Sequence, residues 1–173
     1  MIVPAAKAAA LFFFVAIVQV TIVSSIGILG GSPDLVLVTL VAVALTQGSI
    51  FGAFCGFWAG LLLDIATLGT LGFTSLLLTL AGFWIGRYGE TTARDRFHAP
   101  FTSVAVVTVA FAFGSLALRF VLGENAPAGP VVDALPAAIV LNLVLTFPVY
   151  ALVRRLLPPT DISDRIREVR LLG

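Results

Sequence analysis

Charge is scarce in this chain of 173 residues, of which 11% are Asp, Glu, Lys or Arg and 60% are hydrophobic. A soluble domain typically carries about 25% charged and about 45–50% apolar residues. Between residues 1 and 86 the only charged side chains are Lys7, Asp34 and Asp64. A soluble chain of this size must cover itself with polar surface, which this stretch cannot supply. We therefore predict an all-α integral membrane protein.

Cysteine and histidine are equally scarce, with one residue of each. The single Cys55 excludes an internal disulfide, and His98 has no Cys, Asp or Glu cluster around it that could complete a metal site. No Ser-His-Asp set and no phosphate-binding loop is present. Basic residues interleaved with aromatics, as in single-strand nucleic-acid binders, are also missing. We expect no enzymatic activity, no cofactor, no metal and no nucleic-acid partner.

The hydrophobic runs predict about six transmembrane helices in a single domain of residues 1–158, because a span needs roughly 20 apolar residues. The uncharged stretch 35–63 would form a single helix about 43 Å long, longer than the roughly 30 Å hydrocarbon core. The polar and small residues at 46–49 are therefore interpreted as a break between two short spans. One long tilted helix, giving five spans, remains open. The expected spans cover residues 4–25, 33–46, 49–65, 71–88, 97–122 and 136–157, with loops at 26–32, 87–98 and 123–135.

Basic residues near span ends set the orientation of a membrane protein, since they stay preferentially in the cytoplasm. With six spans, Arg119 is the only basic residue on one side, so both termini are predicted to be cytoplasmic. Residues 159–173 are expected to form a short cytoplasmic basic amphipathic tail, which lies on the inner leaflet or on a partner, or serves only to set the topology. The other side carries Lys7, Arg87, Arg94, Arg96, Arg154, Arg155, Arg165, Arg167 and Arg170.

A glycine stripe, formed by Gly48, Gly52, Gly56 and Gly60, recurs every four residues and is continued by Asp64. Residues four apart lie on one face of a helix. In lipid, small residues at this spacing let two backbones approach closely, which drives helix association. The stripe either packs this helix inside its own bundle or docks the helix of a partner.

Asp64 closes the stripe near the end of its span. A carboxylate within the membrane zone is costly and is a functional candidate by default. The other interpretation is structural: the carboxylate bonds to backbone N–H groups of the turn at residues 67–72. Asp34, at the start of the second span, could lie close to it. Asn142 and Thr146 share one helical face and are interpreted as hydrogen-bonding groups between helices or as a substrate contact, whereas Glu90 is assigned to a solvated basic loop.

One longer pattern joins these motifs. It consists of Pro33-Asp34-Leu35, the series Gly48, Gly52, Gly56 and Gly60 followed by Asp64, and then Gly69 and Gly72. This pattern resembles the MreD family of rod shape-determining proteins. The resemblance implies a non-enzymatic scaffold of the peptidoglycan elongation machinery in the bacterial cytoplasmic membrane. It would bind an MreC-type single-span protein with a periplasmic domain and help to regulate RodA and its penicillin-binding partner.

The same resemblance supplies an alternative function. The MreD family is similar in fold to the substrate-binding S-components of energy-coupling-factor transporters, which bind vitamins. A vitamin binder needs an outer pocket with several convergent polar side chains.

Overall fold

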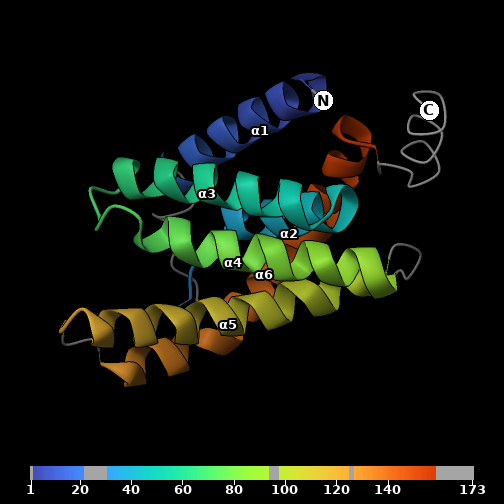
Figure 1. Cartoon of the computed structure of the whole chain (residues 1–173). Coiled ribbons are helices and arrows are strands. Elements are labelled where there is room, and N and C mark those ends of the chain that lie inside the picture. The colour runs from blue at the N-terminus through green and yellow to red at the C-terminus, as the bar shows by residue number, and fades with distance from the viewer. Residues whose placement is uncertain (1, 22–30, 94–97, 125–126, 159–173) are drawn as a thin grey trace, which may run out of the picture.

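The computed structural model describes residues 2–21, 31–93, 98–124 and 127–158, and within them the chain is almost entirely helical (Figure 1). This confirms the all-α prediction. The predicted tail at 159–173 lies outside the described residues, as does most of the expected first loop. The helices are α1 (Ile2–Thr21), α2 (Leu35–Gln47), α3 (Ser49–Ala66), α4 (Phe73–Tyr88), the π-helical turn η2 (Gly89–Ala93), α5 (Ala99–Val121) and α6 (Ala128–Leu156).

The break between the second and third helices is confirmed, and the single long helix is wrong. Gly48 alone separates α2 from α3. Its φ of 95° lies in the region that side-chain-bearing residues rarely adopt, and glycine enters that region without steric cost. One residue is therefore enough to end one helix and start the next in a new direction.

Helix α2 is the centre of the bundle. Every residue from Val36 to Gln47 is buried, and α2 contacts each of the other five α-helices. In Figure 1 it lies behind α3 and α4, with α1 along one side and α5 along the other. With 13 residues, α2 is only about 20 Å long, which is shorter than the roughly 30 Å hydrocarbon core.

Three helices, α3, α5 and α6, are long and apolar enough to cross a membrane, while α2 and the described part of α1 are shorter apolar helices. Large apolar side chains on the outside of the bundle, such as Phe120 and Phe147, are 83% and 70% exposed. Such a surface is unusual for a soluble protein and ordinary in lipid. That all six helices pass through the bilayer remains a prediction.

We name the two ends of the bundle after Gln47 and Asp34, the residues at the two ends of α2. A hydrogen bond at each end joins α2 to α6. At the Gln47 end, the Gln47 side chain donates to the carbonyls of Leu157 and Pro158 at 3.4 and 2.9 Å, which ties the end of α2 to the end of α6. At the Asp34 end, the backbone N–H of Asp34 donates to the side chain of Asn142 at 2.7 Å. Helix α2 therefore runs parallel to the second half of α6.

The loop predicted at residues 123–135 is wrong in its second half. Helix α6 begins at Ala128 and contains Pro130, Pro136 and Pro148. Pro130 does not prevent this helix, because it lies in the first helical turn, where the missing N–H would have no partner anyway. The expected loop at 87–98 is likewise helical through Ala93.

Truncation of the α2 core should destabilise the bundle. Leu40 is 1% exposed, so Leu40→Ala leaves a cavity and should lower the free energy of unfolding by about 2–5 kcal/mol. Leu80→Ala is the matched control, because Leu80 is 50% exposed on the outside of α4. Unfolding by denaturing detergent in mixed micelles measures both. Equal losses for the two variants would contradict the central place of α2.

Candidate functional site

Helices α3 and α4 form an antiparallel hairpin whose backbones touch. A Cβ added to Gly52 would lie 2.6 Å from the carbonyl oxygen of Gly82, and one added to Gly56 would overlap the carbonyl of Leu78. The fit is mutual, because a Cβ on Gly82 would meet the backbone of Gly52, and one on Gly86 would meet that of Ser49. Small residues on both helices thus make this the closest helix pair of the bundle.

The glycine stripe is therefore covered by α4. Gly60 lies against the backbone of Ser75 near one end of the contact, and Gly48 lies against the Glu90 side chain at the other. A partner helix has no access to the glycine face along this length. The opposing residues Gly82 and Gly86 form the second half of the contact, which the spacing on α3 alone does not disclose.

Asp64 caps the neighbouring helix α4. Its side chain is buried and accepts hydrogen bonds from the N–H groups of Gly72 at 2.8 Å, Thr74 at 3.1 Å and Ser75 at 3.4 Å. These groups lie at the start of α4, where N–H groups have no partner inside their own helix. The N-cap residue of α4, Gly72, has no side chain to bond them. A carboxylate is well placed here, since the helix dipole is positive at this end.

The turn between α3 and α4 is built around the same residue. The N–H of Gly69 donates to the backbone carbonyl of Asp64 at 3.0 Å. Gly72 has a φ of 89°, a value that glycine adopts readily, and its N–H donates to the Asp64 carboxylate. Gly69 and Gly72 therefore belong to one structural unit with Asp64.

Glu90 performs the same task at the opposite end of the hairpin. Its Oε1 accepts hydrogen bonds from the backbone N–H of Ser49 at 2.8 Å and from the Ser49 hydroxyl at 3.0 Å. Helix α3 begins there, and its N-cap Gly48 also lacks a capping side chain. Glu90 is exposed, as a solvated residue should be, but it lies in the helical turn η2 and not in a loop, and its bond to Ser49 was not predicted. In an antiparallel hairpin the residue after the second helix faces the start of the first, and that rule could have predicted this contact.

Asp34 has a separate set of partners and does not join Asp64. Its Oδ1 accepts from the N–H of Leu37 at 2.9 Å and so caps α2. The Gln19 amide holds the adjoining chain, donating to the carbonyl of Pro33 at 3.2 Å and accepting from the N–H of Leu35 at 2.8 Å. These bonds anchor the start of α2 to α1, as the bond from Asp34 to Asn142 anchors it to α6.

A cavity of about 340 Å³, the Asp34 recess, opens beside these groups between α1, α5 and α6. Within it, the Asn142 amide donates to the hydroxyl of Thr108 at 3.0 Å, which joins α6 to α5. The Thr146 hydroxyl instead bonds the Asn142 carbonyl on its own helix, so it does not connect helices. The polar residues that line the recess are Gln19, Ser32, Asp34, Thr108 and Asn142, and apolar ones include Phe111, Val131 and Leu135.

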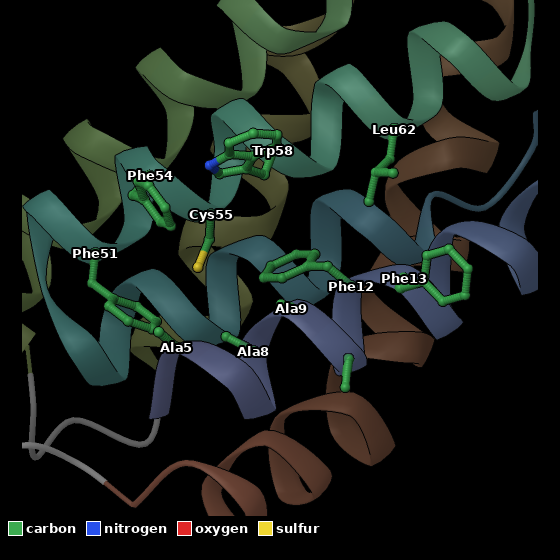
Figure 2. Close-up of a pocket in the computed structure, with 11 residues that line it drawn as sticks. Ala5, Ala8, Ala9, Phe12, Phe13, Phe51, Phe54, Cys55, Trp58 and Leu62 are labelled. Atoms are coloured by element: carbon green, nitrogen blue, oxygen red, sulfur yellow. The ribbon is translucent and has the colours of Figure 1, made fainter. Parts of the chain in front are cut away.

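A second cavity, an apolar groove of about 410 Å³, lies between α1 and α3. Figure 2 shows Phe12 of α1 facing Cys55 of α3, with Phe54 and Trp58 along the rim. The side chains of Phe54 and Trp58 meet edge to face, with ring centroids 6.3 Å apart. No charged side chain lines this groove, so it offers little that would orient a polar ligand.

No group of three or more His, Cys, Asp or Glu side chains gathers anywhere in the described part of the chain.

Comparison with known proteins adds one finding. Residues 6–156 match the family model of the rod shape-determining protein MreD. Among curated proteins and among solved structures, no protein matches the chain. The resemblance to the S-component fold therefore remains a prediction.

A methyl group added to a glycine in the contact between α3 and α4 should destabilise the protein. Gly56→Ala places a Cβ on the Leu78 carbonyl and should lower the free energy of unfolding by about 1–3 kcal/mol, as overpacking does. Gly69→Ala is the control, since its added Cβ would meet the Thr67 hydroxyl oxygen at 3.4 Å, an ordinary contact, and it should not lower the free energy of unfolding. Denaturing-detergent titration measures both, and a neutral Gly56→Ala would argue against the contact.

Replacing Asp64 by asparagine should lower the melting temperature less than replacing it by leucine. Asn keeps one acceptor oxygen for the start of α4, whereas Leu leaves three N–H donors without their partner at a cost of about 1–3 kcal/mol each. The expected order of melting temperature is therefore wild type, then Asp64→Asn, then Asp64→Leu. If the two variants melted at the same temperature, hydrogen bonding to the start of α4 would not explain the stabilising role of Asp64. The negative charge of the side chain would then be required for stability.

Proposed function

Because the chain belongs to the MreD family of rod shape-determining proteins, we propose that it is a non-enzymatic membrane scaffold of the bacterial peptidoglycan elongation machinery. It resides in the cytoplasmic membrane and binds an MreC-type single-span partner. Through that partner it helps to regulate the RodA–penicillin-binding-protein synthase. A rigid bundle suits such a role, and the close backbone contact of α3 and α4 with a carboxylate cap at each end supplies rigidity.

The distribution of charge supports cytoplasmic termini. Of the basic residues in described helices, Lys7, Arg87, Arg154 and Arg155 lie toward the Gln47 end of the bundle, and Arg119 lies toward the Asp34 end. Since basic residues flanking spans remain inside, the Gln47 end is cytoplasmic and the Asp34 recess opens outward. Arg119 is moreover paired with Glu124 at 3.2 Å, which reduces its weight as a topology signal.

The Asp34 recess is the surface that best suits the partner. An MreC-type protein has its folded domain on the outer side of the membrane, where the recess opens. The glycine stripe is occupied by α4 and cannot serve. The recess combines apolar walls with a few fixed polar groups, a combination typical of specific binding sites. We therefore assign the chain segment next to the partner's span to this recess.

One observation favours a second candidate. A cavity of about 340 Å³ with five polar side chains could also hold a small molecule, as the S-component of a vitamin transporter would. A vitamin binder would retain a small molecule at one-to-one stoichiometry after purification, whereas a scaffold would not. Mass spectrometry of the denatured, purified protein distinguishes the two functions.

Filling the recess should abolish capture of the partner. Ala112 lines the recess, and Ala110 on the same helix is exposed on the outside. Ala112→Phe should reduce co-purification of the MreC-type partner at least about tenfold, which corresponds to a loss of about 1.4 kcal/mol. Ala110→Phe should leave it unchanged. In a bacterium that lacks its own copy, only the second variant should restore rod shape.

The proposal is contradicted if Ala112→Phe folds, reaches the membrane and still captures the partner as the wild type does. Loss of capture by both variants would instead point to a general disturbance of α5. Melting temperatures of the two purified variants show that each is folded.

A further inference from the structure

Among the described residues, no basic side chain pairs with the Asp34 carboxylate. The described residues contain two ion pairs, Arg87 with Glu90 and Arg119 with Glu124, and neither includes Asp34. No basic side chain lines the recess. The neighbouring amides of Gln19 and Asn142 bond the backbone of residues 33–35 rather than the carboxylate. Within the described part of the chain, the Asp34 carboxylate therefore accepts its hydrogen bond from the start of α2 and from no cationic side chain.

The Asp34 carboxylate lies short of the far ends of two neighbouring helices. It is about 20 Å from the Gln47 end of α2. Helix α6 continues from Asn142 back to Ala128, which adds about 21 Å beyond the level of Asp34, and α5 rises similarly beyond Thr108. Asp34 consequently sits at the base of a recess walled by α5 and α6. An ionisable side chain at such depth is costly unless it is paired.

We propose that the recess binds a cationic group, a primary amine or a guanidinium, carried by a side chain of the partner segment that enters it. This inference rests on the proposed function, since the partner supplies the cation. A lysine or arginine could lay its aliphatic stem along Phe111, Val131 and Leu135 while its charged end reaches Asp34. The resulting bond would be charge-assisted and screened from water, which makes it both strong and specific.

Asp34→Asn separates the two tasks of this residue. Asparagine is as good an N-cap as aspartate, so the variant keeps the bond to Leu37 and the start of α2 but removes the charge. The probe is butylguanidinium, and its uncharged isostere butylurea is the matched control. With protein in nanodiscs, butylguanidinium at millimolar concentration should raise the melting temperature of the wild type, and butylurea should not. Neither compound should affect Asp34→Asn.

The inference is overturned if butylguanidinium stabilises the wild type and Asp34→Asn equally, or if butylurea acts as well as butylguanidinium. Should Asp34→Asn fail to fold, Ala112→Phe serves as the second variant. It blocks the recess and leaves Asp34 in place, so it must also lose the response to butylguanidinium. A retained response in that variant would place the cation outside the recess and end the proposal.

Co-purification of the MreC-type partner with each variant tests the cation site separately from the proposed function. Asp34→Asn should weaken capture at least about tenfold, as loss of one buried charged partner does. If Asp34→Asn captured the partner fully while Ala112→Phe did not, the recess would still be the partner site, but no cation would be involved. If neither variant changed capture, the assignment of the partner to the recess would fail as well.

Discussion

The backbone contact between α3 and α4 is the constraint on which the rest of the structure depends. In lipid, apolar side chains gain nothing by leaving their surroundings, so helices associate through close packing and hydrogen bonds. Glycines on both helices allow that packing, and they bring the two helix ends close enough for Asp64 and Glu90 to reach across. Asp64 then accepts hydrogen bonds from N–H groups at the start of α4, and Glu90 accepts one at the start of α3. The N-cap of each of these helices is a glycine, which has no side chain to accept them. The hairpin thereby acquires a fixed length and register, against which α1 and α2 pack.

The α3–α4 contact is close-packed, whereas the short central helix α2 leaves a cavity at its start. Because α2 begins well short of the far ends of α5 and α6, it leaves the Asp34 recess where a longer helix would have filled the space. Polar groups at the start of α2 need partners at that depth, and Gln19 and Asn142 provide them from α1 and α6. The partly polar cavity beside the start of α2 thus follows from a difference in helix length.

Local features were accessible from the sequence because they depend on neighbours along the chain. The break at Gly48, the shared face of Gly52, Gly56 and Gly60, and the helical spans follow from period and composition. The start of α6 was misplaced, because a proline in the first turn of a helix looks the same in sequence as a proline in a loop. The role of Glu90 was missed for a related reason: its partner, Ser49, lies 41 positions away along the chain.

The sequence by itself determined that the protein is helical and apolar enough for a membrane, that residues 46–49 favour a break between two helices, and which residues are small enough for close contact. Only the tertiary structure decided what meets the glycines, which helix Asp64 caps, and that Asp34 lines a cavity apart from Asp64. The physical reason is that periodicity reports which face of a helix a residue occupies and not what lies opposite. Backbone N–H groups at helix ends can be satisfied from any neighbouring helix, and that choice depends on how the helices are packed.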